Sequence, residues 1–384
     1  MYIQRNIEQA IKLYAKKFPV LAITGPRQSG KTTLLKNVFP DYQYVSLENP
    51  EIRQMAEQDP NGFLGNFDRY VIIDEAQRVP HLFNYLQTKI DNDQIMGQYI
   101  LSGSQNFLLI EKITQSLAGR LALFKLLPFD FSELKAQNLL PQQFTSAILK
   151  GFYPMLYSRD VAPDEYYPNY LETYIERDVR SILNIQNLNL FRNFIRLCAG
   201  RVGQLLNYSN LANDCGISPK TAQLWITILE ASYIIFQLPP YFKNINTRLT
   251  KSTKLYFWDT GLVANLLGIK TDNQVDSHYA RGSLFENLVV SNFLKEDFHQ
   301  VKRQNFFFYR DSNQNEIDLM IERENGFEII EIKSSQTLSS DFFKGIQHFE
   351  KHFPDLIAEK KLIYGGDSFK EMYKTRVINW RGID

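Results

Sequence analysis

The sequence has almost no charge imbalance, very little cysteine and no long apolar run. Its 43 Lys and Arg residues nearly match its 42 Asp and Glu residues, which argues against a whole-protein affinity for nucleic acid. Cys198 and Cys215 are the only cysteines, and we expect both to be reduced core residues rather than a disulfide or a metal pair. No apolar run approaches the roughly 20 residues that span a bilayer, and residues 1–17 lack the apolar region of a signal peptide. We therefore expect a cytoplasmic protein without a membrane partner.

The first 130 residues alternate short apolar runs with amphipathic stretches. Such alternation predicts an α/β fold in which helices cover both faces of a parallel sheet. We expect strands at 19–24, 42–47, 70–74, 99–102 and 121–127. We expect helices at 32–38, 50–58, 81–91 and 108–117.

The pattern changes near residue 130, and again near residues 200 and 272. Residues 131–200 look like a helical, lid-like segment with a Pro- and Tyr-rich loop at 163–168. Residues 201–272 contain two helices joined by a short turn. From 273 to 384 strand and helix patterns alternate again. We thus predict four segments: 1–130, 131–200, 201–272 and 273–384.

Residues 25–32 read Gly-Pro-Arg-Gln-Ser-Gly-Lys-Thr, between a predicted strand and a predicted helix. This is the spacing and the context of a phosphate-binding P-loop, whose backbone N–H groups form a nest for phosphate oxygens. Lys31 would reach the β- and γ-phosphates, and the Thr32 hydroxyl would bind Mg2+. We therefore predict ATP and Mg2+ as cofactors, with binding residues Gly25, Pro26, Arg27, Gln28, Ser29, Gly30, Lys31, Thr32 and Thr33.

Two further strand ends should complete the nucleotide site. The apolar strand at 70–74 delivers Asp74 and Glu75 beside the loop, where Asp74 would hold Mg2+ and Glu75 would polarise the attacking water. The next strand ends in Ser102-Gly-Ser104, and either serine could sense the γ-phosphate. The residues do not distinguish between the two serines.

Arginines that could reach the phosphates follow later in the chain. Arg120, at the end of a predicted helix, is either an arginine finger that acts on a neighbouring subunit or an ordinary surface arginine. Arg177 and Arg180 are weaker candidates, for which a salt-bridged helix face is the favoured interpretation.

These motifs together resemble a family of bacterial and archaeal AAA+ ATPases whose core is followed by a C-terminal domain of unassigned function. The resemblance rests on the P-loop and on residues 72–77, 101–105, 117–120, 176–178 and 257–262. It implies an AAA+ core, a homo-oligomer and a role linked to nucleic acid.

The segment 201–272 has the spacing of a helix-turn-helix. A glycine turn at 216–219 separates two helices, and the stretches 234–242 and 254–257 could form the wing of a winged helix. Lys220, Thr221 and Gln223 would face a DNA groove. The alternative is a module that packs against protein, and the single cation on the second helix weakens direct base reading.

Four charged residues of the last segment form a second candidate site. Glu286 lies in a predicted helix, Asp318 in a strand, and Glu331 and Lys333 on one face of the next strand. Two carboxylates and an amine that converge can hold a divalent metal for phosphodiester hydrolysis. The pattern resembles the restriction-endonuclease-like fold, in which these positions form the active site. The alternative is a retained fold with a dormant site.

We therefore expect a P-loop AAA+ parallel-sheet core, a helical and winged-helix segment, and a C-terminal restriction-endonuclease-like α/β domain. The expected activity is ATP hydrolysis, coupled to a nuclease-like domain that acts on DNA with a second divalent metal. The rivals are an ATP-dependent switch or scaffold with an inactive nuclease fold, and a protein remodeller. His348 and His352, one helical turn apart, are expected to lie on a solvated helix face rather than to bind metal.

Overall fold

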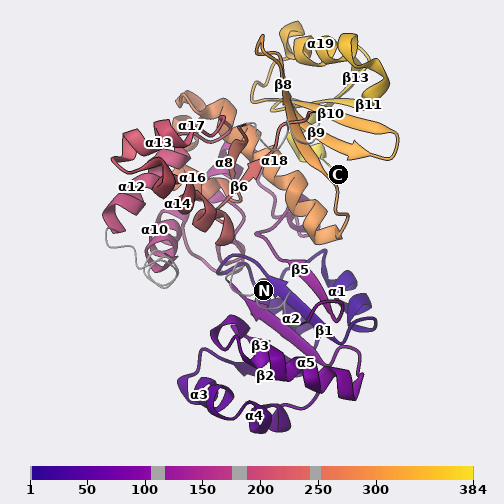
Figure 1. The fold of residues 1–384 in the computed structure, drawn as a ribbon. Helices are drawn as coiled ribbons and strands as arrows, with labels where there is room; N and C mark the ends of the chain where they lie inside the picture. Colours follow the sequence, from indigo (N-terminus) through magenta and orange to yellow (C-terminus); the bar gives the residue numbers. More distant parts are fainter. Residues whose placement is uncertain (1, 105–116, 175–187, 243–251, 384) are drawn as a thin grey trace. The chain divides into compact units, whose positions relative to one another are not determined.

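The computed structural model describes residues 2–104, 117–174, 188–242 and 252–383. The chain divides into two compact units (Figure 1). The first comprises Met1–Phe129 with Ala231–Tyr233 and Phe298–Val301. The second comprises Asp130–Glu230, Ile234–Asp297 and Lys302–Asp384.

The first unit is built on a five-stranded parallel sheet of order β2-β3-β4-β1-β5. Its strands are β1 (Val20–Thr24), β2 (Gln43–Ser46), β3 (Val71–Asp74), β4 (Tyr99–Gly103) and β5 (Leu121–Lys125). Its helices are α1 (Glu8–Ala15), α2 (Lys31–Val38), α3 (Pro50–Gln58), α4 (Pro60–Asn66) and α5 (Leu82–Asp93). Because the strands are parallel, the carboxyl ends of β1, β3 and β4 meet at one edge of the sheet.

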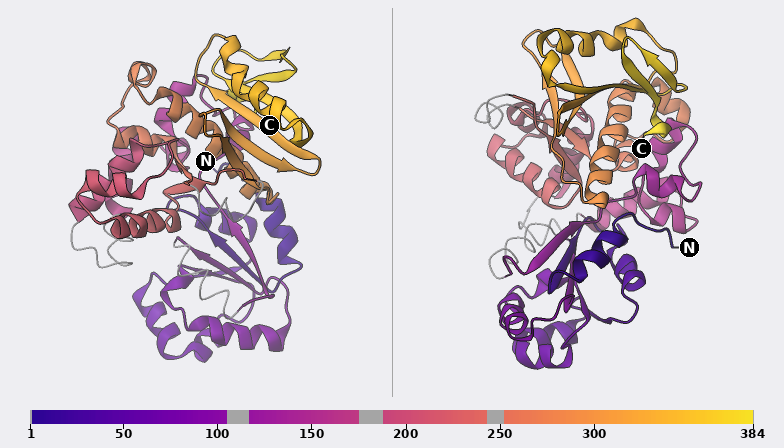
Figure 2. Two further views of the ribbon diagram at one scale, coloured as in Figure 1. Left: turned by 45° about the horizontal axis from the view of Figure 1, so that its top comes forward. Right: turned by 90° about the vertical axis from the view of Figure 1, so that its right-hand side faces the viewer.

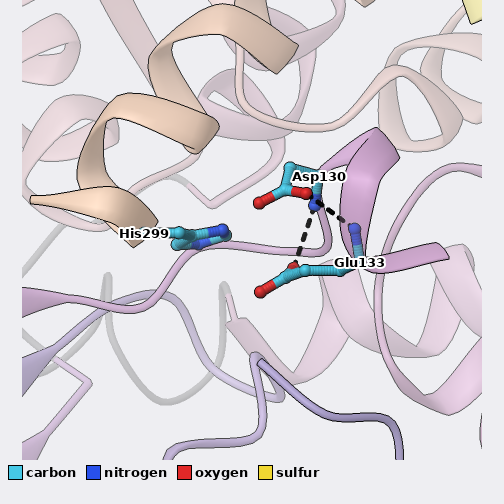
Figure 3. Close-up of side chains that lie close together, drawn as sticks. All are labelled: Asp130, Glu133 and His299. Carbon is cyan, nitrogen blue, oxygen red and sulfur yellow. Dashed lines mark hydrogen bonds between the residues drawn. The ribbon is translucent and has the colours of Figure 1, made fainter. Parts of the chain in front are cut away.

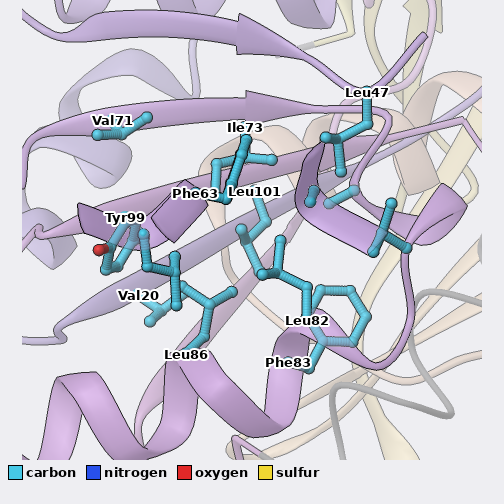
Figure 4. Packing of buried hydrophobic residues seen from close by; sticks show 14 of the residues in the cluster. Val20, Leu47, Phe63, Val71, Ile73, Leu82, Phe83, Leu86, Tyr99 and Leu101 are labelled. Atoms are coloured by element: carbon cyan, nitrogen blue, oxygen red, sulfur yellow. The ribbon is translucent and has the colours of Figure 1, made fainter. Parts of the chain in front are cut away.

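Both faces of this sheet are buried, as expected for parallel strands. Along β1, Val20 and Ala22 belong to one apolar cluster, whereas Leu21 and Ile23 belong to another. Figure 4 shows the first cluster, in which Phe83 and Leu86 of α5 pack against the sheet. Burial of each large apolar side chain stabilises the unit by about 1.5–3 kcal/mol, so the sheet is a firm base for the strand ends.

The five predicted strands of this unit are confirmed, and so are the predicted helices at 32–38, 50–58 and 81–91. The predicted helix at 108–117 falls almost wholly outside the described residues. The parallel sheet covered on both faces confirms the α/β class.

The second unit begins with helices. They are α7 (Phe131–Lys135), α8 (Phe144–Lys150), α9 (Met155–Ser158), α10 (Pro163–Tyr174), α12 (Leu188–Ala199), α16 (Thr260–Leu266) and α17 (Asp272–Ser277). A capping box fixes the start of α7: Glu133 donates its backbone N–H to Asp130, and the Glu133 carboxylate accepts the backbone N–H of Asp130 (Figure 3).

The Pro- and Tyr-rich loop predicted at 163–168 is wrong, because this stretch begins helix α10. Pro163 occupies the first position, where its missing N–H costs nothing. Pro168 lies inside the helix, yet Tyr167, Tyr170 and Tyr174 are buried at helical spacing. The burial of this tyrosine stripe outweighs the lost hydrogen bond at Pro168.

The two helices predicted on either side of residue 216 are confirmed. They are α13 (Tyr208–Cys215) and α14 (Pro219–Ala231), and Gly216 ends the first in the left-handed conformation. An antiparallel pair follows, β6 (Ile235–Leu238) with β7 (Lys254–Phe257). This order of elements is compatible with a winged helix, which stays a prediction.

The C-terminal part holds a mixed six-stranded sheet of order β12-β13-β11-β10-β9-β8 (Figure 2). Its strands are β8 (Phe306–Arg310), β9 (Glu316–Arg323), β10 (Gly326–Lys333), β11 (Ile357–Tyr364), β12 (Phe369–Met372) and β13 (Thr375–Asn379), and its helices are α18 (Arg281–Gln300) and α19 (Lys344–His352). None of the helices in the described part of the chain is both long and apolar enough to cross a membrane.

The outer strand of this sheet, β8, is covered by a short stretch of chain that follows β6. Tyr241 donates its backbone N–H to the carbonyl of Phe308 at 2.6 Å, and Phe308 donates its own backbone N–H to the carbonyl of Pro239 at 3.1 Å.

The two cysteines are core residues. Cys198 and Cys215 are buried free thiols, so the prediction of reduced core residues is confirmed.

Candidate nucleotide and metal sites

The P-loop runs from the end of β1 to the start of α2. Gly25 and Gly30 have φ angles of 152° and 92°, which L-residues with a side chain rarely adopt. A Cβ on Gly25 would lie 2.0 Å from the carbonyl oxygen of Leu126. The backbone of the loop therefore packs directly against the chain that follows β5, and only glycine fits at position 25.

The side chains of Lys31 and Ser29 indicate that the loop binds phosphate. The Lys31 ammonium donates to the carbonyl oxygens of Gly25 and Pro26 at 2.9 and 2.8 Å. The hydroxyl of Ser29 is buried, and no described residue hydrogen-bonds to it. Arg5 stabilises the loop by donating a hydrogen bond to the carbonyl oxygen of Ser29 at 3.0 Å. A buried hydroxyl without a partner beside a helix N-terminus fits a bound phosphate.

Asp74 is the centre of the polar contacts at this sheet edge. Its Oδ2 accepts hydrogen bonds from Thr32 and Tyr44, both at 2.8 Å, and its Oδ1 accepts one from Ser102 at 2.5 Å. The structure thus brings Thr32, Asp74 and Ser102 together as expected. Tyr44 was not predicted; burial and its bond to Asp74 raise the pKa of its hydroxyl, which remains a hydrogen-bond donor at neutral pH.

Glu75 follows β3 in a left-handed conformation, with φ 54°. Its Oε2 accepts a hydrogen bond from the Gln77 amide at 2.5 Å and a longer one from Ser104 at 3.4 Å. The two candidate serines therefore separate: Ser102 contacts Asp74, and Ser104 contacts Glu75. Gln77 was not predicted, although its place two residues after Glu75 is a signal that could have been used.

Arg120 forms an ion pair on the surface of its own chain. Its guanidinium donates to both carboxylate oxygens of Asp91, at 2.5 and 2.9 Å, and this pairing lowers the pKa of Asp91. Action on a neighbouring subunit stays a prediction. Arg177 and Arg180 lie outside the described residues.

Three of the predicted charged residues of the second unit lie close together on two paired strands. Strands β9 and β10 are antiparallel, with Leu319 opposite Ile330. Asp318 Oδ2 accepts the backbone N–H of Ile332 at 2.8 Å and lies 3.3 Å from the Lys333 ammonium. Lys333 also donates to Glu331 at 2.5 Å. The predicted convergence of Asp318, Glu331 and Lys333 is thus present.

Glu286, on helix α18, completes the predicted set, and Glu316 joins it. One carboxylate oxygen from each of Glu286, Glu316 and Asp318 lies within 4.8 Å of the others. Glu316 was not predicted as a ligand, although it lies two residues before Asp318 and therefore on the same face of β9. We call these three residues together with Glu331 the carboxylate cluster.

Two residues of strand β7 reach this cluster and were also missed. Lys254 lies 2.8 Å from Glu286 and 2.5 Å from Glu316, and Tyr256 donates to Glu286. Although burial opposes it, the Glu286 carboxylate raises the pKa of Lys254 well above its usual value, so the ammonium stays charged. A lysine and a tyrosine two positions apart in an otherwise apolar strand were the available signal.

The acids of the carboxylate cluster are buried close together, which disfavours their ionised forms. Burial and the nearby Asp318 carboxylate raise the pKa of Glu331 to about 8, and burial also raises that of Glu286. Oxygen Oε2 of Glu331 is buried, and no described residue hydrogen-bonds to it. Oxygen ligands in excess, with one orphaned, fit a hard divalent cation such as Mg2+.

The remaining candidate residues, on helices α19 and α14, lie outside both sites. His348 pairs with Asp311 at 3.0 Å, and His352 is exposed on the same face of α19. No cluster of potential metal ligands among the described residues includes either histidine. Lys220 and Gln223 are exposed on α14, and Thr221 is half-buried.

Three family models match the chain in succession. Residues 17–135 match an AAA domain, and residues 141–273 and 281–382 match two domains of unknown function (DUF8612 and DUF4143). An uncharacterized protein of Mycobacterium tuberculosis is 29% identical over 337 residues, which are 85% of this chain and 73% of that protein. An uncharacterized protein of Haemophilus influenzae is 22% identical over 329 residues, 77% of this chain and 79% of that protein.

Among solved structures, a Walker-type ATPase of Pyrococcus abyssi is 16% identical, with a TM-score of 0.45 over 69% of this chain and 96% of that one. The AAA domain match carries the assignment, because it covers the P-loop, the Asp74–Glu75 pair and Ser102. Residues 17–135 of this chain are an AAA-type ATPase domain.

Proposed function

We propose that this protein uses ATP hydrolysis to control a metal-dependent nuclease site that acts on DNA. The AAA-type domain supports the ATPase part. The contact of Asp318, Glu331 and Lys333 on paired strands carries the nuclease part, because this set combines metal ligands with a cation for the developing phosphate charge.

In the nucleotide site, the P-loop amides and Lys31 would hold the phosphates, while Thr32 and Asp74 would hold Mg2+. The metal would neutralise charge on the β- and γ-phosphate oxygens. Glu75 would accept a proton from the attacking water, and the Gln77 amide would keep the Glu75 carboxylate in place. Ser102 would keep Asp74 oriented.

In the C-terminal unit, Glu286, Asp318 and Glu331 would hold the divalent metal, which would supply Lewis-acid activation of the phosphodiester. Lys333 contacts both Asp318 and Glu331, so its ammonium would lie beside the metal and orient the attacking water or balance phosphate charge. The buried environment strengthens each of these electrostatic contacts.

DNA binding and assembly complete the proposal. The helix pair α13–α14 with the β6–β7 hairpin would act as a winged helix, with Lys220, Thr221 and Gln223 toward DNA. A homo-oligomer would let Arg120 reach the nucleotide of a neighbouring subunit, once it left Asp91.

The ATPase part is tested with Glu75→Gln in the full chain. This variant should bind a fluorescent ATP analogue as wild type does, while phosphate release falls by about 100-fold or more. The exposed Glu57→Gln variant is the control. Full turnover in Glu75→Gln would remove Glu75 from the mechanism.

The nuclease part is tested with linear, circular and single-stranded DNA, in Mg2+ or Mn2+, with and without ATP. Cutting should disappear in Lys333→Ala and persist in Lys351→Ala, which changes an exposed lysine of the same unit. If no DNA is cut under any condition, the C-terminal unit is a binding or regulatory module, and ATP hydrolysis alone stands.

A further inference from the structure

Lys254 is the most deeply buried charged group at the carboxylate cluster, and the proposed chemistry does not use it. Its side chain is only 3% exposed. It comes from strand β7, within the segment 141–273, whereas Glu286, Glu316 and Asp318 belong to the segment 281–382. The ammonium is therefore delivered to the acidic residues by a different part of the chain.

The ammonium contacts oxygens of two acids that could bind a metal. Lys254 Nζ lies 2.8 Å from Glu286 Oε1 and 2.5 Å from Glu316 Oε1, and one carboxylate oxygen from each of these residues and from Asp318 lies within 4.8 Å of the others. A hard divalent cation binds such oxygens at about 2.0–2.6 Å. One oxygen cannot offer its lone pairs fully to an ammonium and to a metal at once.

We propose that Lys254 competes with the divalent cation for the carboxylate cluster. While its ammonium contacts Glu286 and Glu316, the metal binds weakly, and a movement of strand β7 that takes Lys254 away lets the metal bind. This inference rests on the proposed metal site and adds its regulation. The hydroxyl of Tyr256, on the same face of β7, donates to the same oxygen of Glu286 and strengthens the block.

A second observation shows that the block is incomplete. Glu331 is 7% exposed, and its Oε2 receives no hydrogen bond from any described residue. Four carboxylates face Lys254, Lys333 and, at the outer side, Arg310, which lies 3.4 Å from Glu316. Glu331 therefore keeps a buried oxygen that neither lysine occupies and that a cation could still bind.

The test is Mn2+ binding to the full chain, measured from the electron paramagnetic resonance signal of free Mn2+. Wild type and Lys254→Met are compared, each with and without Asp318→Asn, so that binding at the nucleotide site is subtracted. The Asp318-dependent site should bind Mn2+ about tenfold more tightly, or better, in Lys254→Met. Lys361→Met is the matched control, because Lys361 is a half-buried lysine of the six-stranded sheet that pairs with Glu328 at 2.6 Å; the Mn2+ affinity of this variant should stay at the wild-type value.

The outcomes separate this proposal from the proposed function. Unchanged or weaker Asp318-dependent binding in Lys254→Met overturns the competitor and leaves the metal site standing. No Asp318-dependent binding in either protein overturns the metal site, and with it the competitor. If Lys254→Met does not fold, Tyr256→Phe replaces it: this change removes one competing donor, and it should tighten Mn2+ binding about two- to threefold. Unchanged binding there counts against the proposal.

Discussion

The nucleotide site combines the continuous loop 25–32 with strand ends of one parallel sheet, whereas the carboxylate cluster collects its side chains from α18, β9 and β10, with Lys254 and Tyr256 of β7 against it. In the first site, backbone groups of the loop would be the main binding elements, and the φ values at Gly25 and Gly30 set the direction of these groups. In the second, the backbone is regular strand and helix, and charged side chains would bind the proposed metal. Substitutions should therefore damage the first site through conformation and the second through charge.

The largest effect is expected from Gly25→Ala, which disrupts the loop conformation of the nucleotide site. The added Cβ would lie 2.0 Å from the carbonyl of Leu126, at a φ of 152°, so the loop and the end of β5 cannot both keep their positions. We expect loss of ATP binding and a loss of about 3 kcal/mol or more in the free energy of unfolding. Equilibrium titration with an ATP analogue and urea denaturation measure the two effects.

Gly65→Ala is the control for this prediction, because no atom lies within 4 Å of its added Cβ and the residue is helical. It should change stability by no more than about 1 kcal/mol. Normal ATP binding by Gly25→Ala would show that the loop adapts, and that conformation does not limit this site.

A smaller effect is expected from Gln77→Ala, which tests a side-chain contact inside the nucleotide site. The Gln77 amide donates to Glu75 at 2.5 Å, so its loss should leave the Glu75 carboxylate less well placed. We expect kcat to fall about tenfold, while the Kd for ATP stays constant. The exposed Gln58→Ala variant should match wild type. A raised Kd with normal kcat would instead assign Gln77 to nucleotide binding.

The third effect appears only at high pH and concerns a buried acid of the second unit outside the carboxylate cluster. Burial and the nearby Asp130 carboxylate raise the pKa of Glu296 to about 7. The folded protein thus favours the neutral acid. Its contribution to stability is complete below about pH 4.5, and it is lost as the pH rises through 7. At pH 8 the free energy of unfolding of Glu296→Gln, measured by urea denaturation, should therefore exceed that of wild type by up to about 3 kcal/mol.

This advantage of Glu296→Gln should vanish near pH 4.5. Glu324→Gln, which changes an exposed acid of the same unit, should show no such pH dependence. An equal effect at both pH values would mean that packing rather than ionisation distinguishes the Glu296 variant.

The two sites also differ in how well the sequence predicts them. Residues 25–32 define their site by themselves, and the strand ends at Asp74 and Ser102 follow from the parallel alternation. Asp318, Glu331 and Lys333 were predictable because neighbouring strands with period-two side chains leave few other arrangements. Lys254 was not, because the lysine and the tyrosine of β7 indicate a polar face of that strand but not the distant element that this face approaches. The loop predicted at 163–168 failed because two prolines were given more weight than the helical spacing of the tyrosines.

The stretch of chain that covers β8 has a consequence for how this protein can be divided. Tyr241 and Pro239 use the outer hydrogen-bonding groups of Phe308, which would otherwise form an open sheet edge. Open edges accept strands from other molecules and promote aggregation. A fragment that begins near residue 273 would lack this cover, so the C-terminal sheet should remain monodisperse only when it is expressed together with the hairpin that precedes it.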